Sequence, residues 1–251
     1  RKSPVPPKVV MATRGSPTLS AVGRGLDDDG VEDKLRDLPK SRKYGMLDFS
    51  SNHIAARGAR LIANLAVDCR PNLTILKIYK NDLGDEGAKE LAHLVEHHSL
   101  RELHLSHNGI AAEGAQALLQ AARRGLSSRE EPIFIRLEQN RLERSADVVL
   151  KVLDRDEFCC RYDDGCTRHK CAFGRKIHLP MIWKQEGVTD VSQDKKALMG
   201  GSPCPTRRGG GARIGARLAS TRDMGSGRGA SRVHAEPKGS ERDRAGGCRR
   251  G

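Results

Sequence analysis

The sequence predicts an α/β solenoid, in which strand–helix units stack so that their strands form one parallel sheet. Three observations lead to this prediction. A segment of the form L-x-L-x-x-N-x-L, with Ile or Phe sometimes replacing Leu, occurs four times. The aligned asparagines lie 29, 27 and 32 residues apart, which is the spacing of a repeat architecture. After the first three segments, apolar residues recur at the spacing of an amphipathic helix.

The four segments are the predicted strands, and they begin at Leu47, Leu76, Leu103 and Ile135. Alternate side chains of a strand point to the same side, so the first and third residue of each segment should face the core. An asparagine stands where the chain leaves each strand, and its amide can bond backbone groups of its own and of the neighbouring unit. We therefore expect a structural ladder made of Asn52, Asn81, Asn108 and Asn140.

The helices are expected to begin close to the neighbouring unit. Gly58, Gly87 and Gly114 each lie six residues after an asparagine, and an alanine follows each of them. Such small side chains let a helix start pack closely against the next repeat. The fourth unit lacks this glycine, as terminal repeats often do, so we expect about four units within residues 41–154.

A strand and a full helix in about 28 residues resemble the ribonuclease-inhibitor-like class of leucine-rich repeats. That class includes the repeats of NOD-like receptors and of the Ran GTPase-activating protein. The resemblance implies a leucine-rich repeat solenoid, with strands on the concave face and helices on the convex face. It implies no catalytic role, because function depends on sites that differ between members of one fold.

Side chains on the strand side form the predicted protein-binding surface. They mix charges with one aromatic residue, which suits the polar surface of another protein. The alternative is that they are only solvated strand positions. The sequence shows no Ser/His/Asp set and no phosphate-binding glycine loop, so we expect no enzymatic activity. The predicted partner-binding residues are Asp48, Lys77, Tyr79, His104, His107, Arg136 and Glu138.

A cysteine-rich segment follows the repeats. Four of the seven cysteines fall within thirteen residues, a clustering that favours metal binding over dispersed disulfides. Three thiolates and an imidazole can close a tetrahedral zinc site, so we expect one zinc ion held by Cys160, Cys166, Cys171 and His178. The alternative is a C-terminal cap on the repeats, in which the cysteines only pack.

Three short stretches of this segment, Cys-Arg-Tyr, Gly-Cys and Cys-Ala-Phe, resemble the sequences of CCCH zinc fingers. In that family aromatic side chains stack on single-stranded RNA, which would give this role to Tyr162 and Phe173. The family usually places its histidine four residues after the last cysteine, where Arg175 stands here. His178 or His169 would have to replace it.

Charge and composition divide the chain further. The net charge is +13, and residues 191–251 carry 14 Lys and Arg against 5 Asp and Glu, a net of +9. Few apolar residues occur there, so a packed core is not expected. The predicted parts are a mostly disordered segment (1–40), the repeats (41–154), a cap or zinc module (155–188) and a disordered basic tail (189–251).

We therefore predict an interaction scaffold that binds a protein partner. Two alternatives remain open. One is a zinc-dependent RNA-binding protein, because a basic tail favours polyanions. The other is a GTPase regulator, by analogy of fold alone. No apolar run approaches the roughly 20 residues that span a bilayer, so we expect no membrane partner and a cytoplasmic protein, with the nucleus as the alternative.

Overall fold

The computed structural model describes residues 16–199, except residues 40, 42, 70, 71, 162–165 and 167–170. Most of the predicted basic tail therefore lies outside the described residues, as do Tyr162 and His169.

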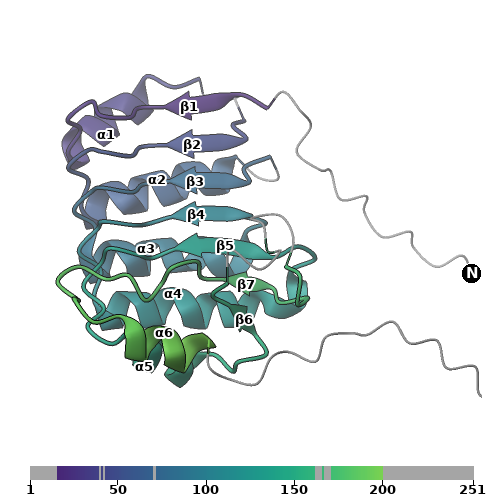
Figure 1. Ribbon diagram of the computed structural model, residues 1–251. Helices are drawn as coiled ribbons and strands as arrows, with labels where there is room; N and C mark the ends of the chain where they lie inside the picture. Colours follow the sequence, from purple (N-terminus) through teal and green to yellow (C-terminus); the bar gives the residue numbers. More distant parts are fainter. Residues whose placement is uncertain are drawn as a thin grey trace, which may run out of the picture. The chain divides into compact units, whose positions relative to one another are not determined.

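Seven parallel strands form one sheet in the order β1-β2-β3-β4-β5-β7-β6 (Figure 1). The strands are β1 (Thr18–Ser20), β2 (Met46–Asp48), β3 (Ile75–Lys77), β4 (Glu102–His104), β5 (Ile133–Arg136), β6 (Phe158–Cys159) and β7 (Ile177–His178). The helices are α1 (Asp28–Arg36), α2 (Ala56–Asp68), α3 (Gly84–His97), α4 (Ala112–Arg124), α5 (Ser145–Val152) and α6 (Ser192–Met199), and the short 3-10 helix η1 (Gly125–Ser128) follows α4.

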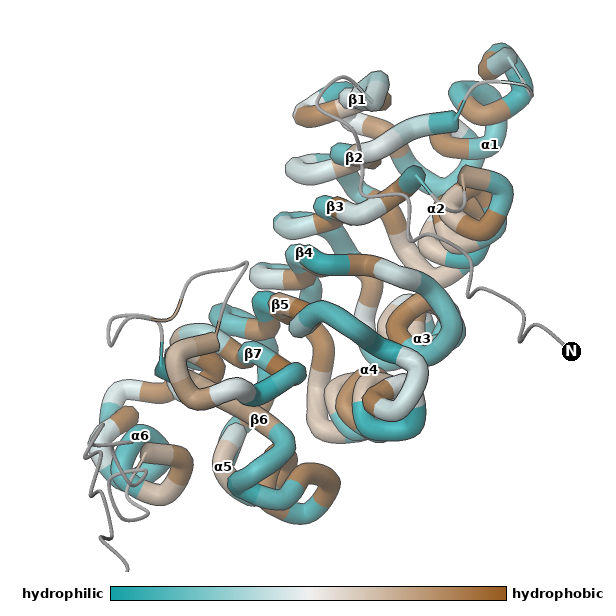
Figure 2. Tube along the Cα trace, turned by 90° about the vertical axis from the view of Figure 1, so that its right-hand side faces the viewer, coloured by the Kyte–Doolittle hydropathy of each residue, from teal (hydrophilic) through white to brown (hydrophobic). Residues whose placement is uncertain are grey.

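Helices and strands occupy two layers. Helices α1 to α4 stack on one side of the sheet, and the strands line the other side (Figure 2). This arrangement confirms the predicted α/β solenoid with a parallel sheet. Among the described helices, none is long and apolar enough to cross a membrane.

The core lies between the two layers and is built by strand alternation. The first residues of the four predicted segments are cross-strand neighbours at the same register, and their side chains are fully buried. The third residues of the segments are buried in the same way. The two core rows are Leu47, Leu76, Leu103 and Ile135, and Phe49, Ile78, Leu105 and Leu137.

A further strand–helix unit precedes the four predicted ones. Strand β1 pairs with β2, and α1 packs beside α2, so the prediction of a mostly disordered segment to residue 40 is wrong for residues 18–36. Leu19, Ala21 and Val31 fill its core positions. This unit does not match the repeat pattern, because Ala21 replaces the second leucine of the pattern and Arg24 replaces the asparagine.

The asparagines form hydrogen bonds that join neighbouring units. Asn140 is representative: its Oδ1 accepts from the backbone N–H of Asn108 at 2.9 Å and of Ile110 at 3.1 Å. Its Nδ2 donates to the carbonyls of Leu105 and Leu137, both at 3.0 Å. Since Asn140 is fully buried, it satisfies four backbone groups that no water can reach.

The residue before each asparagine lies in the left-handed region, with φ between 55° and 58°. This conformation turns the chain out of the strand and brings the asparagine amide toward the preceding unit. The four residues are Ser51, Lys80, His107 and Gln139.

Close packing between units explains two of the repeated glycines. Asp85 at the start of α3 accepts a hydrogen bond from the backbone N–H of Ala111, just before α4, at 2.7 Å. A Cβ added to Gly114 would lie 2.6 Å from Asp85 Oδ1 and 2.7 Å from its Cα. Asp28 and Gly58 repeat this arrangement between α1 and α2. Glycine is therefore needed where the carboxylate of one unit reaches the helix start of the next.

The C-terminal end of the sheet departs from the repeat order. Strand β7 follows β6 in sequence but lies between β5 and β6. Gln185 then continues the asparagine ladder: its Oε1 accepts from Asn140 N–H at 3.0 Å, and its Nε2 donates to Leu137 O at 3.2 Å. Helix α6 is held by buried Asp194, which accepts from the backbone N–H and the hydroxyl of Ser145, both at 2.9 Å.

Candidate functional site

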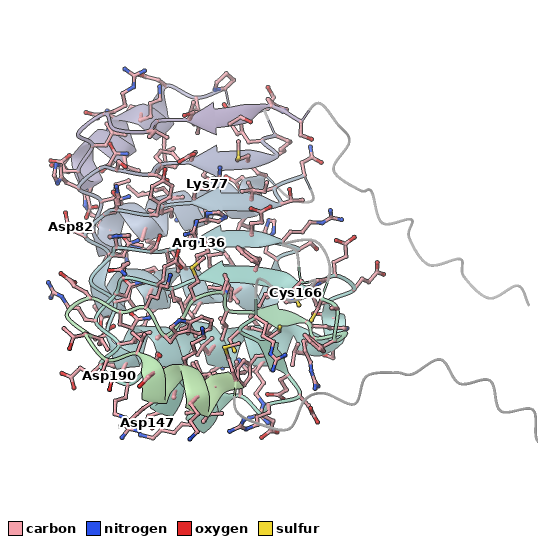
Figure 3. All side chains as sticks on the ribbon, viewed as in Figure 1. Lys77, Asp82, Arg136, Asp147, Cys166 and Asp190 are labelled. Carbon is pink, nitrogen blue, oxygen red and sulfur yellow. The ribbon has the colours of Figure 1, made fainter. Side chains whose placement is uncertain are left out.

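The side of the sheet opposite the helices carries a row of ionisable side chains. Asp48, Lys77, His104 and Arg136 are cross-strand neighbours in β2 to β5. They alternate with core residues along each strand, so they point away from the helices. We call the surface formed by these four residues the strand face, and Figure 3 labels Lys77 and Arg136 on it.

The charges of the strand face are paired with one another or with neighbouring strand residues. Lys77 Nζ lies 3.9 Å from Asp48 Oδ2, and their side chains are 27% and 15% exposed. His104 Nε2 lies 3.1 Å from Glu102 Oε2. Arg136 Nε donates to Glu138 Oε1 at 2.6 Å. The row therefore holds one acid, Asp48, and three basic side chains that each lie beside an acid, and it remains partly exposed.

Three other predicted partner-binding residues lie around this row. Tyr79 is partly exposed two residues beyond Lys77, on the same side of the sheet. Glu138 is buried, at 5% exposure, beside Arg136. His107 is exposed but lies at the left-handed turn after β4, away from the row.

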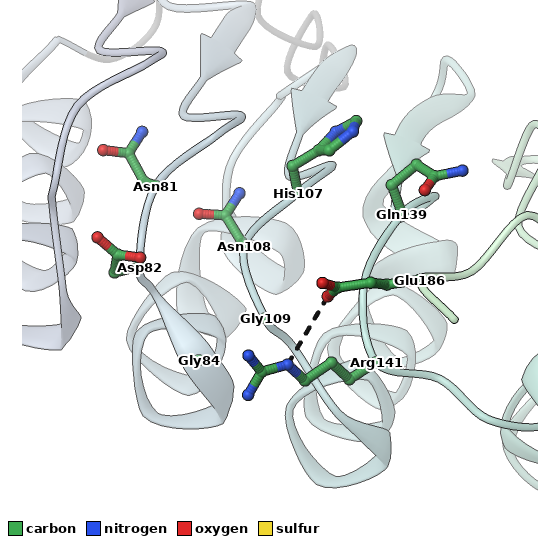
Figure 4. A pocket seen from close by; sticks show the side chains of 9 residues that line it. All are labelled: Asn81, Asp82, Gly84, His107, Asn108, Gly109, Gln139, Arg141 and Glu186. Carbon is green, nitrogen blue, oxygen red and sulfur yellow. Dashed lines mark ion pairs between the residues drawn. The ribbon is translucent and has the colours of Figure 1, made fainter. Parts of the chain in front are cut away.

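His107 instead lines a shallow polar groove at the end of the strands (Figure 4). The groove has a volume of about 530 Å³. Arg141 and Glu186 lie along one side, with 3.7 Å between Nε and Oε2, and both are largely exposed. The lining also includes Asn81 and Asn108, whose side chains form backbone hydrogen bonds of the ladder.

A second row on the same side of the sheet is partly exposed in β2 and β3 and buried from β4 to β6. In β2 and β3 it holds the partly exposed Met46 and Ile75. Phe134 in β5 is 6% exposed and His178 in β7 is 3% exposed, and they are cross-strand neighbours with ring centroids 6.4 Å apart. The row ends at Cys159 in β6, the neighbour of His178.

Three cysteines meet at this end of the sheet. Cys159 Sγ lies 3.6 Å from Cys166 Sγ, which lies 3.9 Å from Cys171 Sγ. All three side chains are buried, and their sulfurs all lie within 4.8 Å of one another. We call this group the cysteine cluster. It is the single group of three or more potential metal ligands found among the described residues.

The cluster differs from the predicted ligand set in one cysteine and in the absence of His178. Cys166 and Cys171 meet as predicted, but the third member is Cys159 and the Cys160 side chain packs in the apolar core. The physical reason is strand alternation: Phe158 and Cys160 face the core, so Cys159 between them points to the opposite side. His178 does not belong to the group within 4.8 Å, although it neighbours Cys159.

Burial shapes the acid–base properties of these side chains. Burial raises the pKa of Cys159 far above its usual value, and the neighbouring cysteines raise it further. Burial also raises the pKa of Cys171, and that of Cys160 to about 11. The pKa of His178 is lowered by burial, which a hydrogen bond with the Arg175 backbone opposes. A bound cation would reverse the effect for the cluster, because it stabilises thiolates.

The aromatic residue predicted to stack on RNA is already in contact with a cation. The Arg161 guanidinium carbon lies 5.6 Å from the centroid of the Phe173 ring, which packs against the cysteine cluster. Its proposed partner in RNA stacking, Tyr162, is outside the part of the chain that the structure describes.

Sequence reasoning missed two residues of this region. Cys159 would have been found by reading Phe158-Cys159-Cys160 as a short strand with two core positions. Gln185 would have been found as a longer substitute for a ladder asparagine, placed six residues after the core residue Leu179 rather than five.

The comparisons with known proteins agree with the repeat geometry. Residues 70–92 and 96–119 match the family described as Leucine Rich repeat. Residues 70–119, which include β3, α3, β4 and most of α4, are therefore leucine-rich repeats. A search of curated proteins found no match to the chain. Leucine-rich repeats suggest a protein-interaction module, and neither the partner nor a zinc finger follows from the match.

Proposed function

We propose that the protein binds another protein through its strand face. The observation that carries this proposal is the row of four partly exposed ionisable side chains on the side of the sheet opposite helices α1 to α4. The same positions form the predicted partner-binding surface. Parallel stacking of the repeats holds the four side chains in fixed register without any partner present.

The chemistry of the row favours a polypeptide surface over a small apolar ligand. Each basic side chain of the row is already paired with an acid, so a partner must offer both donors and acceptors to displace or extend these pairs. Tyr79 adds a partly exposed aromatic side chain of the kind enriched at protein interfaces. The groove beside His107 is lined by polar residues and glycines and is not included in the proposed surface.

Site-specific crosslinking tests this proposal. The photoreactive residue p-benzoylphenylalanine would be introduced in place of Tyr79, and in a second variant in place of Leu150. Leu150 is a matched control, because it is 38% exposed and lies on α5. Both full-length variants would be expressed in cells, irradiated and analysed by mass spectrometry.

We expect adducts with a discrete protein at position 79 and background labelling at position 150. Lys77→Glu in the Tyr79 variant should remove the adduct, since it places two acidic side chains side by side. The proposal fails if position 150 forms the adducts and position 79 does not, or if Lys77→Glu leaves the adducts unchanged.

We propose as a second function that the cysteine cluster binds one zinc ion. Two sulfurs bound to one tetrahedral zinc at about 2.3 Å lie about 3.8 Å apart. The sulfur–sulfur distances of 3.6 and 3.9 Å in the cluster lie on either side of this value. They are far longer than a disulfide bond of about 2.05 Å, and all five described cysteines are free thiols.

Metal analysis of the full chain, purified without chelator, tests this second proposal. We expect one zinc per chain and a lower melting temperature after chelation, because bound metal stabilises the folded state. Cys166→Ser should remove the metal, since Cys166 is the central member of the cluster. A wild-type chain without zinc, or a variant that retains it, would overturn the proposal.

A further inference from the structure

We infer that His178 is the fourth ligand of the zinc site, so that the metal is enclosed by three thiolates and one imidazole and holds β7 between β5 and β6. This inference rests on the proposed zinc site of the cysteine cluster. It assigns the site to the structural class, in which four protein ligands leave no open position.

The sheet register places His178 beside the cluster. His178 in β7 is the cross-strand partner of Cys159 in β6. The two residues point to the same side of the sheet, since each alternates with core residues: Ile177 and Leu179 beside His178, Phe158 and Cys160 beside Cys159. Neighbouring strands lie about 4.8 Å apart. The imidazole and the thiol are therefore adjacent side chains on one surface.

One nitrogen of the His178 imidazole has no hydrogen-bond partner among the described residues. This atom is Nε2, which is buried, and His178 as a whole is 3% exposed. Buried polar atoms in folded proteins nearly always have a partner, so such an atom calls for a ligand. The imidazole also has a hydrogen bond with the Arg175 backbone, and metal-bound histidines commonly have an outer partner of this kind.

Coordination requires a small rearrangement of this side chain. His178 is outside the group whose ligand atoms lie within 4.8 Å of one another. Because the sheet register already places His178 next to Cys159, we expect a change in its side-chain torsions, and not in the strand pairing, to complete the site. Cys160, the other nearby candidate, would need to leave the core, where it is 3% exposed.

A closed site would explain how two very short strands are held. Strands β6 and β7 contain two residues each. A metal bound by Cys159 and His178 links these strands directly, and Cys166 and Cys171 fix the connection between them to the same point. The only tryptophan of the chain, Trp183, lies five residues after His178, is 8% exposed and contacts Lys195, with 5.5 Å between Nζ and the ring centroid. Its fluorescence therefore reports on this end of the molecule.

Cobalt substitution of the 251-residue chain tests the inference, because the visible absorption of bound Co²⁺ depends on the number of thiolate ligands. The variants are His178→Ala, His178→Cys and Cys160→Ser. His98→Ala is the matched control for loss of a buried imidazole, since His98 is also 3% exposed but bonds to Ala66 O at 3.2 Å. Zinc affinity would be measured in parallel by competition with a chromogenic chelator.

We expect the wild type to show the spectrum of three thiolates and one nitrogen ligand. His178→Ala should weaken zinc binding at least tenfold, a lower bound taken from the effect of losing outer-shell partners. His178→Cys should keep one metal per chain and shift the spectrum to that of four thiolates. Cys160→Ser and His98→Ala should leave the spectrum unchanged. Chelation should shift Trp183 emission to the red in the wild type.

The outcomes separate this inference from the zinc proposal. A wild-type chain that binds no zinc overturns both. A wild type that binds one zinc while His178→Ala keeps the same affinity and spectrum overturns the role of His178 alone. If His178→Ala does not fold, His178→Cys decides, because an unchanged spectrum would show that residue 178 is not a ligand. Trp183 emission that does not respond to chelation would contradict the structural role of the metal.

Discussion

The central repeats and the C-terminal end of the sheet are stabilised in different ways. Strands β2 to β5 have three or four residues each, and every one is followed by a helix and a ladder asparagine. Strands β6 and β7 have two residues each, and no described helix separates β6 from β7 in the chain. Each central unit therefore satisfies its neighbour's backbone with the same set of side chains, whereas the end unit needs different chemistry.

The hydrogen bonds of the asparagine ladder illustrate this difference between the central repeats and the C-terminal end. Asn140 closes its unit through four backbone hydrogen bonds with the units on its N-terminal side and with its own strand. Gln185 forms the corresponding hydrogen bonds with the backbone of Asn140 and Leu137. Its side chain is longer than that of asparagine, and it follows β7, which neighbours β5 in the sheet but not in the sequence. Each repeat is thus stabilised by contacts with its neighbours. At the end of the array, Gln185 and the cysteine cluster replace the contacts that a further repeat would make.

Truncation in the central core should have the largest effect. Leu103 is fully buried in β4, and Leu103→Ala should lower the free energy of unfolding by about 2–5 kcal/mol through lost burial and a cavity. This loss is measured by urea denaturation monitored by circular dichroism. The loss should be equal in zinc-loaded and chelated protein, because β5 and β7 lie between β4 and the cysteine of β6. A loss below about 1 kcal/mol would contradict the core position of Leu103.

Removal of a ladder amide should have the next largest effect and should distinguish the two regions. Asn140→Ala leaves buried backbone groups without partners and should cost about 2–4 kcal/mol. Gln185→Ala, at the end of the ladder, should cost about 1–2 kcal/mol, because fewer hydrogen bonds are lost. The same denaturation experiment measures both variants. Equal losses in the free energy of unfolding would mean that the end of the ladder stabilises the fold as much as its interior does.

A glycine substitution should have the smallest effect but a sign that depends on position. Gly114→Ala should cost about 1–2 kcal/mol net, because overlap with the Asp85 backbone outweighs the gain in helix propensity. Gly30→Ala in α1 is the control. Its added Cβ would meet only the side chains of Leu26 and Asp27, at 3.2 Å or more. We expect Gly30→Ala to be neutral or to raise stability by at most about 1 kcal/mol. Thermal melts of both variants measure the difference, and a stabilising Gly114→Ala would contradict the close contact between units.

Most of the central repeats could be predicted from the sequence because their pattern is local. The period of two in each strand, the period of the helix and the recurring asparagine are all visible within one unit. The first unit was missed because its pattern is degenerate. Ala21 and Arg24 occupy positions where the other units have a large apolar residue and an asparagine, and only the pairing of β1 with β2 identifies them.

The sequence by itself determined the repeated α/β architecture, the core rows and the asparagine ladder, because each follows from side chains a few residues apart. The tertiary structure alone decided that β7 enters between β5 and β6 and that Cys159, not Cys160, joins Cys166 and Cys171. The physical reason is that these contacts join segments whose relative position depends on the fold of the whole sheet. Adjacent cysteines point to opposite sides of a strand, so the pairing of that strand determines which thiol reaches the cluster.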